Sequence, residues 1–592
     1  MKRRPSDRLV LSALATLGFL APGWLTLAEA RPIPATWTHA RSGPPVVGRG
    51  IVTSASAAAS RVGARILEQG GNAFDAAVAV HFALAVTFPE AGNLGGGGFW
   101  VLREASGSTW ALDARETAPR GSSRDMFLDA SGQATDRSVA GGLAVGVPGS
   151  VQGCWEVHRR LGSLPWARCL APAIDLARHG VTVDAGLATS FRRCATLLGR
   201  RPATRDLFMP GGRPLVEGDR LVQPDLARTL EAIASEGPDA FHRGPIARAI
   251  AATVQAEGGI LDEQDLAAYR AVWREPLHFT YRGLRFAAMP PPSSGGVILG
   301  ECLGMLEPTD LRNAGFHDPE VVHRVAEVER RAFADRNAYL ADPDFLPAPI
   351  TRLLDTAYLA RRASTIDPAR TTPEASRPGL TEHLETTHFT IVDPAGHAAS
   401  VTTTLNGSFG TGIVAEGTGV LLNNEMDDFA TRPGFPNQFG LVQSEANAVA
   451  PGKRPLSSMC PVIAEDDSGR LAFALGSPGG STIPTSVLQV ILNLVDLGMN
   501  ARQAVEAPRF HHQGLPERLD LEPGGFDVET REALVRKGHV LFERPLGDVH
   551  LIRRQPDGSL EGWSDPRRGG QAIAIAPLPR ERTPANAPPE GK

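Results

Sequence analysis

The sequence of 592 residues is poor in cysteine and has no strong excess of charge of either sign. Its five cysteines are too few for a disulfide framework, and their odd number leaves at least one unpaired. Periodicity predicts Cys154 and Cys302 as buried apolar residues, and we predict no disulfide and no zinc site. The formal net charge of −5 provides no field that would attract nucleic acid or an anionic membrane. We therefore expect a small soluble partner.

Familiar catalytic signatures are also missing. The glycine-rich run GNLGGGGF, residues 92–99, lacks the GK[ST] of a phosphate-binding loop and follows a predicted helix. No G-x-S-x-G sequence exists, so a conventional serine-hydrolase triad has no anchor. The adjacent His511 and His512 point their side chains apart, which favours a structural pair over a shared metal ion. The sequence thus predicts no metal site.

The N-terminus has the features of an export signal. A basic start, MKRRPSDR, precedes an apolar run over residues 9–27, and Ala28-Glu29-Ala30 supplies small residues for a cleavage site. We expect a signal peptide over residues 1–30, removed from a periplasmic or secreted protein without stable membrane insertion. The run approaches the length that spans a bilayer, so a retained anchor is the alternative, although Pro22 and Gly23 interrupt it.

Hydrophobic patterns change character along the chain. Residues 54–88 predict two helices separated at Gly70-Gly71, the second apolar nearly all round and so buried. Hairpins are predicted at residues 99–116 and 277–289, with helical patterns over 150–260 and an amphipathic helix over 329–342. Beyond Glu385, alternating patterns predict antiparallel strands, including residues 387–393 and 398–406, then an apolar helix over 486–498. This grouping predicts two antiparallel sheets covered by helices.

A series of motifs begins at Thr386. The run TTH is followed by TLNGSFGTGIV, LLNNEMDDF, KRPLSSM and GSPGGS, and preceded by AGNLGGGGF and ALDARETAP. In order and spacing this series closely resembles the γ-glutamyltransferases, a family of N-terminal-nucleophile hydrolases. The resemblance implies a four-layer αββα sandwich and a precursor that cuts itself between Glu385 and Thr386. It implies a large subunit, residues 31–385, and a small catalytic subunit, residues 386–592, interdigitated in one globular unit.

Self-cleavage would explain why a plain threonine can act as the nucleophile. A threonine hydroxyl attacks poorly unless a base removes its proton. A free α-amino group has a pKa of about 7.7–8.0, so part of it is unprotonated at neutral pH. As a chain terminus, Thr386 would carry both the attacking oxygen and its base. Taken alone, Thr386 would be an ordinary β-branched residue that begins a strand.

The resemblance also assigns a surrounding shell, which suits a γ-glutamyl group because a buried pocket must pair both its α-ammonium and its α-carboxylate. Arg115, Ser457 and Ser458 would bind the carboxylate. Asp428, Glu425 and Asn406 would hold the ammonium. Each has a structural alternative: Arg115 could form a surface ion pair with Glu116, and the acids could be turn or capping residues.

Three further residues complete the implied catalytic set. Thr404 corresponds to the family threonine that hydrogen-bonds the nucleophile. Gly479 and Gly480 would provide backbone N–H groups for an oxyanion hole, although a helix-entry turn would use the same glycines. Phe439, in the segment RPGFPNQFG that matches the family's lid loop, departs from the tyrosine common in bacterial relatives. It loses the hydroxyl that would have latched the lid to Asn406.

The resulting hypothesis is a glutathione hydrolase and γ-glutamyltransferase that needs no metal or organic cofactor. Its substrates would be glutathione and other γ-glutamyl amides, with water or amino-acid and dipeptide amines as acceptors. A cephalosporin (glutaryl) acylase is the nearest alternative, but a glutaryl chain would leave Asp428 without a cationic partner. Processing of poly-γ-glutamate needs an open cleft, which the lid segment disfavours. An exported binding protein without activity is the alternative from another class.

Overall fold

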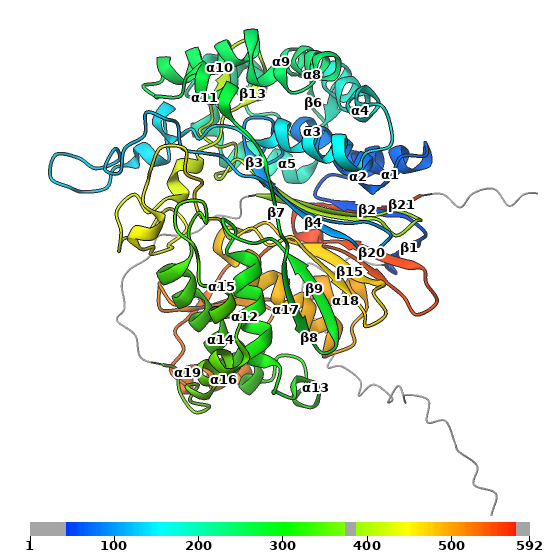
Figure 1. The fold of residues 1–592 in the computed structure, drawn as a ribbon, viewed down its shortest axis with the longest axis vertical. Coiled ribbons are helices and arrows are strands. Elements are labelled where there is room, and N and C mark those ends of the chain that lie inside the picture. Colours follow the sequence, from blue (N-terminus) through cyan, green and yellow to red (C-terminus); the bar gives the residue numbers. More distant parts are fainter. Residues whose placement is uncertain (1–42, 373–385, 576–592) are drawn as a thin grey trace, which may run out of the picture.

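The computed structural model describes residues 43–372 and 386–575 (Figure 1). The predicted signal peptide and Glu385 lie outside these residues. No helix within the described ranges is long and apolar enough to cross a membrane. The five cysteines are free thiols, and Cys154 and Cys302 are buried, as their periodicity predicts.

Two antiparallel sheets of seven strands each are stacked at the centre of the molecule. The first sheet has, in spatial order, β21 (Gln571–Ala574), β2 (Ile51–Ser54), β10 (Thr387–Val392), β11 (Ala398–Thr404), β3 (Gly97–Arg103), β4 (Thr109–Ala114) and β7 (Val272–Arg274). The second has β1 (Val46–Gly48), β20 (Leu560–Ser564), β19 (His550–Arg554), β15 (Leu471–Gly476), β14 (Val462–Glu465), β9 (Leu284–Ala288) and β8 (Leu277–Tyr281). Strand β10 packs against both β15 and β19 across the interface between the sheets.

Helices cover both outer faces of this pair of sheets (Figure 1). The first sheet is covered by α1 (Ala57–Glu68), α2 (Ala73–Thr87) and α3 (Ser150–Leu161). The second is covered by α12 (Gly295–Leu306), α17 (Ile483–Val495) and α18 (Ala501–Glu506). The fold is therefore the expected four-layer αββα sandwich, and the predicted hairpins at β3–β4, β8–β9 and β10–β11 are confirmed.

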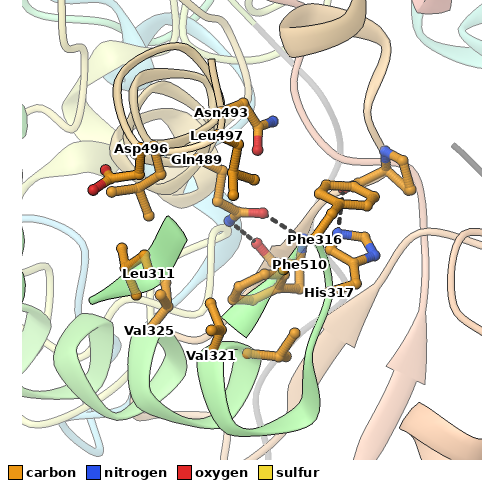
Figure 2. Close-up of a pocket in the computed structure, with 14 residues that line it drawn as sticks. Leu311, Phe316, His317, Val321, Val325, Gln489, Asn493, Asp496, Leu497 and Phe510 are labelled. Atoms are coloured by element: carbon orange, nitrogen blue, oxygen red, sulfur yellow. Dashed lines mark hydrogen bonds between the residues drawn. The ribbon is translucent and has the colours of Figure 1, made fainter. Parts of the chain in front are cut away.

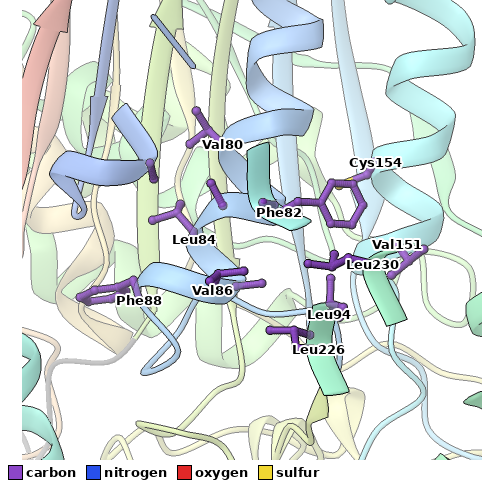
Figure 3. Packing of buried hydrophobic residues seen from close by; sticks show 14 of the residues in the cluster. Val80, Phe82, Leu84, Val86, Phe88, Leu94, Val151, Cys154, Leu226 and Leu230 are labelled. Carbon is purple, nitrogen blue, oxygen red and sulfur yellow. The ribbon is translucent and has the colours of Figure 1, made fainter. Parts of the chain in front are cut away.

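Helix α2 shows how the sequence determines one of these layers. Every one of its residues is buried, as the uniformly apolar pattern predicts. Asn72 begins the helix with a capping box, in which its side chain accepts from the N–H of Asp75 and the Asp75 carboxylate accepts from the N–H of Asn72. Figure 3 shows α2 side chains such as Phe82 packed against Val151 and Cys154 of α3 and Leu230 of α8 (Pro224–Glu236).

Additional helices form an outer shell around the first sheet's helical layer. They are α4 (Trp166–His179), α5 (Ala185–Arg193), α6 (Ala195–Leu198), α7 (Pro202–Phe208), α8 (Pro224–Glu236), α9 (Asp239–His242), α10 (Gly244–Ala256) and α11 (Glu263–Ala268). On the other side lie α13 (Leu311–Ala314), α14 (Pro319–Tyr339), α15 (Ile350–Leu353), α16 (Thr356–Ser364) and α19 (Val528–Arg536). Short strands pair as β5 (Val181–Thr182) with β6 (Arg220–Leu221), β12 (Val414–Ala415) with β13 (Val420–Leu421), and β16 (Phe510–His511) with β17 (Leu519–Leu521) and β18 (Leu541–Glu543).

Helix α14 differs from its prediction in extent and in burial. The prediction began at residue 329, whereas the helix begins at Pro319, after the capping side chain of Asp318. Its charged residues are not on a solvated face, because Glu327, Arg331 and Arg336 are all buried. An amphipathic pattern placed these residues outside, whereas tertiary ion pairs and the site cavity allow them inside.

Candidate active site

One cavity brings together residues that are far apart in the sequence. It has a volume of about 320 Å³ and lies at the end of β10 and β11. Ten of the residues singled out in the sequence line it: Arg115, Thr386, Thr404, Asn406, Glu425, Asp428, Phe439, Ser457, Ser458 and Gly480. Gly479 is the neighbour of one of them, and Glu385 lies outside the described residues.

Thr386 lies immediately before β10, where the β10–β11 hairpin determines its surroundings. The register pairs Thr387 with Thr403, which brings Thr386 opposite Thr404. The two hydroxyl oxygens are 3.2 Å apart, a hydrogen bond in which either can donate. The Thr404 hydroxyl also accepts the backbone N–H of Asn406 at 2.8 Å. The Thr386 oxygen is therefore held in place by a hydroxyl that is itself fixed.

The backbone of Thr386 is strained. Its φ of 86° lies in the left-handed region, which a β-branched side chain rarely adopts. Such conformations typically cost about 1–3 kcal/mol and occur where the surrounding structure imposes them. The strained residue here is the one whose preceding peptide bond the resemblance marks for scission.

Arg115 is fully buried just beyond β4, which rules out the surface ion pair. Its guanidinium forms short ion pairs with Glu425 and Asp428, and lies 3.6 Å from Glu116. Burial tends to lower the pKa of Arg115, but these three carboxyls raise it overall, so the cation is permanent. Burial raises the pKa of Glu116 to about 8 and that of Glu425 well above its usual value. Three carboxyls around one cation therefore hold a proton near neutral pH.

Arg115, Glu425 and Asp428 are together called the clamp, and its two acids are presented by η4 (Glu425–Asp428), a short 3-10 helix. The Asn423 side chain accepts the N–H of Glu425, and the side chains of Gln443 and Asn447 both donate to the Asp428 carbonyl. These bonds are among buried groups, so the acids are on rigid backbone. The capping alternative does not describe them, since their carboxylates face Arg115.

Ser457 and Ser458 line the same cavity from a neighbouring extended segment. The N–H of Ser457 donates to the Pro292 carbonyl, and its own carbonyl accepts the N–H of Ser294. The buried Ser458 hydroxyl has no hydrogen-bond partner within the described chain. A buried hydroxyl without a partner costs stability, so this one is available to a ligand.

The Gly479-Gly480 turn lies between β15 and α17. Gly479 has φ 132° and Gly480 has φ 56°, conformations suited to glycine. Neither N–H donates to any backbone or side-chain acceptor given for the described residues. A Cβ atom on Gly480 would lie 2.8 Å from the ring of Phe439. The turn is thus covered by the predicted lid residue.

The Phe439 loop is closed over the cavity without a tyrosine hydroxyl. Asn437 accepts the N–H groups of Phe439 and Leu441 at 3.0 and 3.1 Å, and Gln513 donates to the Phe439 carbonyl at 3.2 Å. The Asn406 side chain donates instead to the Asn424 carbonyl. The side chains of Asn437 and Gln513 therefore hold the backbone of this loop, where the family pattern would use a tyrosine hydroxyl.

Sequence reasoning missed Arg336, which also lines the cavity. It is buried on α14, and its Nη2 has no hydrogen-bond partner in the described structure. Burial lowers its pKa to about 10, and the nearby Asp428 opposes that shift. Nothing in the motif series marks this arginine, and its segment was predicted only as an amphipathic helix.

Other candidates lie outside this site. His511 and His512 are buried, with pKa values lowered to about 3 by burial, and they bond to Gln513, Thr485 and Gly514 as structural groups. A separate cavity of about 450 Å³ lies between α14 and α17 (Figure 2). Its lining is largely apolar, and the figure shows Gln489 bonded to Phe510. No serine, threonine or cysteine lines it.

Comparisons with known proteins agree with this arrangement. Residues 59–575 match the family model described as Gamma-glutamyltranspeptidase. The chain is 46% identical over 526 residues to the glutathione hydrolase proenzyme of Escherichia coli strain K12, covering 88% of this chain and 90% of that one. It is 44% identical over 538 residues to that of Pseudomonas aeruginosa, with 89% and 95% covered. A solved cephalosporin acylase from Bacillus halodurans is similar with a TM-score of 0.80 and 28% identity, covering 93% of this chain and 99% of that one.

Proposed function

We propose, from the premise that this chain belongs to the γ-glutamyltranspeptidase family, that it is a glutathione hydrolase and γ-glutamyltransferase. The observation that carries the proposal is the position of Thr386. Its hydroxyl is 3.2 Å from that of Thr404, in the same cavity as the ion-paired Arg115 and Asp428. A potential nucleophile and a pair of opposite charges are thus presented to one small ligand.

Maturation would use the same hydroxyl as catalysis. Thr386 Oγ1 adds to the carbonyl carbon of Glu385, the peptide C–N bond breaks, and an ester joins the two residues. Water then hydrolyses this ester, leaving a Glu385 carboxylate and a free Thr386 amine. The strained φ of Thr386 favours this route, because cutting the bond removes the constraint on that dihedral. The products would be residues 31–385, after removal of the signal, and residues 386–592.

In the mature enzyme the Thr386 amine would accept the hydroxyl proton as Oγ1 attacks the γ-glutamyl carbonyl. The N–H groups of Gly479 and Gly480 would stabilise the oxyanion, an effect that is typically worth about 10²–10³ in turnover. The proton passes to the leaving amine, cysteinylglycine when glutathione is the donor. Water, or the amine of an amino acid or dipeptide, then opens the γ-glutamyl ester.

The charged groups of the clamp are complementary to the two charges of a γ-glutamyl donor. Arg115 is paired with the two acids expected to bind an ammonium. A zwitterionic ligand between them would take the guanidinium with its carboxylate and the acids with its ammonium. Ser457 and Ser458 would add hydroxyl donors to the carboxylate, and Asn406 would support the ammonium. Arg115 and Asp428 would each have a partner of opposite charge before and after binding, which avoids the large cost of an isolated buried ion.

The glutaryl acylase alternative is weaker for the same reason. A glutaryl carboxylate would displace the acids from Arg115 but would supply no cation for Asp428. A site built to pair a group can reject ligands that lack it by about 10⁴-fold. The similarity to a cephalosporin acylase structure supports the shared fold, whereas the higher sequence identity is to glutathione hydrolase proenzymes. We also propose that the protein is exported, as its N-terminal sequence predicts.

Two measurements test this function. Purified protein should give two bands on a denaturing gel, and N-terminal sequencing of the smaller fragment should begin Thr386-Thr387-His388. The variant T386A should remain one uncut chain without turnover. The matured protein should hydrolyse γ-glutamyl-4-nitroanilide faster than glutaryl-4-nitroanilide. An uncut wild-type chain that binds ligand without turnover would establish a binding protein instead, and faster glutaryl cleavage would establish an acylase.

A further inference from the structure

An arginine outside the motif series binds the backbone of the candidate nucleophile. Arg568, the last residue of η7 (Pro566–Arg568), donates from Nη1 to the Thr386 carbonyl at 2.9 Å. Only 11% of its side chain is exposed, and its guanidinium lies over the ring of Phe88 with 5.0 Å to the centroid. A side chain confined by both packing and a hydrogen bond has little freedom to leave the carbonyl.

Glu90 fixes the other end of this guanidinium. Arg568 Nη2 is 3.0 Å from Glu90 Oε2, and Glu90 also pairs with Arg193. The Glu90 carboxylate accepts the hydroxyls of Ser190 and Ser408 at 2.6 and 2.8 Å. Burial alone would raise the pKa of Glu90, but the two arginines and the hydroxyls lower it overall, so it remains a carboxylate. The position of Arg568 is thus set by α5, by the end of α2 and by the loop that follows β11.

We propose that Arg568 is a positioning residue for Thr386, which orients the nucleophile through its carbonyl and keeps the liberated amine in its neutral, basic form. Holding the carbonyl fixes the first peptide plane of β10, and so fixes the direction in which the side chain leaves toward Thr404. The future amine is three covalent bonds from the carbonyl oxygen that Arg568 binds. A cation so close disfavours the ammonium form and lowers the pKa of the amine.

Other charged groups lie around Thr386 at a greater distance than Arg568. Across the cavity they are of both signs: Arg115, Arg336, Glu425 and Asp428. On β10 itself, His388 is buried and bonded to Thr402 and Thr390, and burial keeps its pKa well below the usual value, so it is neutral. Within the described chain, Arg568 is the cation that directly contacts Thr386. Glu90 partly offsets the positive charge of Arg568, so replacing either residue would change the electrostatic effect on the Thr386 amine.

The inference rests on the proposed function, so the experiment first establishes wild-type turnover of γ-glutamyl-4-nitroanilide. The pH dependence of kcat/KM is then compared for wild type, R568Q, R568K and E90Q, each purified in cleaved form. In R568Q the acidic limb should move up by roughly half to one pH unit, because the amine becomes more basic. R568K retains the cation and should remain near wild type. E90Q removes the compensating anion and should move the limb down.

The outcomes separate positioning from a merely structural role. Equal losses of kcat/KM in all variants with unshifted pH profiles would overturn the proposal, as would an R568Q profile that coincides with wild type. A folded R568Q chain that fails to cut itself supports the proposal, since scission uses the same oriented hydroxyl. Should R568Q not fold, as judged by thermal melting, E90Q decides: a downward shift supports the inference and an unchanged profile refutes it. Absence of wild-type turnover would instead refute the proposed function.

Discussion

At the scale of single residues, the candidate site depends on hydroxyls and charges that are held by their neighbours. Thr404 is an example, because its oxygen accepts the Asn406 N–H while its hydroxyl is hydrogen-bonded to that of Thr386. Asp428 is another, because two amide side chains hold its backbone while its carboxylate faces Arg115. Residues with such support lose function when their polar group is removed, even where the fold is unaffected.

Removing the Thr404 hydroxyl should slow the chemical step. We expect T404A to lower kcat about 10- to 100-fold with little change in KM, because the hydroxyl contacts the nucleophile and not the donor. Steady-state kinetics with γ-glutamyl-4-nitroanilide measures this split. T404S keeps the hydroxyl and serves as the matched control; a similar loss in T404S would show that the methyl group matters instead.

Neutralising Asp428 should change specificity more than chemistry. D428N cannot pair the α-ammonium, so kcat/KM for γ-glutamyl-4-nitroanilide should fall by about 10²-fold or more, mostly through KM. Turnover of glutaryl-4-nitroanilide, which lacks that ammonium, should be unchanged or improved. The ratio of the two kcat/KM values is the informative quantity. Equal losses for both substrates would argue that Asp428 acts on the fold or on Arg115 alone.

At the scale of elements, the loop around Phe439 is held in place by hydrogen bonds between side chains and the loop backbone. Asn437 accepts two N–H groups of the loop and donates to the Asp427 carbonyl at 3.4 Å, while the N–H of Gln438 donates to the Asp427 carboxylate. The ring of Phe439 covers Gly480, where the oxyanion would form. Access of water to the ester intermediate is therefore linked to the order of this loop.

Loosening this loop should favour hydrolysis over transfer. N437A removes the acceptor for two N–H groups, a local cost of about 1–2 kcal/mol, and should leave global melting unchanged. We expect faster proteolysis at the loop and a higher ratio of hydrolysis to transfer with a dipeptide acceptor. N437D retains the acceptor oxygen but loses the donor to the Asp427 carbonyl, so its product ratio should lie between those of wild type and N437A. If the ratio of hydrolysis to transfer is unchanged in N437A, the order of this loop does not determine which acceptor is used.

At the scale of the whole molecule, both sheets are built from chain on both sides of Thr386. In the first sheet β10 lies between β2 and β11, and in the second β14 lies between β15 and β9. Cutting the chain before Thr386 would therefore break no sheet hydrogen bond between strands. The buried cluster around Arg115 similarly joins β4 to η4 across the cut.

The two fragments should consequently remain associated after maturation. We expect residues 31–385 and 386–592 to elute together in size-exclusion chromatography without denaturant, and to separate only in denaturing gels. Their joint unfolding in urea should be a single transition, because neither fragment holds a complete sheet. Two separate transitions, or elution of a free small fragment, would contradict this interleaved assembly.

Stability should fall with rising pH because of the buried carboxyl of Glu116. Its pKa is raised by burial to about 8, so between roughly pH 4.5 and 8 the folded state binds more protons than the unfolded state. Denaturant midpoints at pH 5, 6.5 and 8 should therefore decrease for wild type. E116Q carries no titrating group at this position, and its midpoint should decline less over the same range. A parallel decline in both proteins would assign the effect to other groups.

The amino-acid pattern was enough to predict most of the strands and helices and the layered architecture, and the family resemblance supplied nearly all of the candidate site. Uniform apolarity identifies a buried helix because every face of it meets the core, as in α2. The motif series names ten residues that line one cavity. Local pattern also predicted that α14 carries its charges outward, and there it was wrong.

The pairing of charges and the strain at Thr386 depend on contacts between distant parts of the chain. The contacts of Arg115 with Glu425 and of Arg568 with Thr386 join residues separated by 310 and 182 positions, a relation that no local pattern contains. The roles of Arg336 and of the Asn437 ties likewise depend on what packs nearby. A side chain's chemistry follows from its sequence, whereas its burial and its partners follow from the folding of distant segments onto each other.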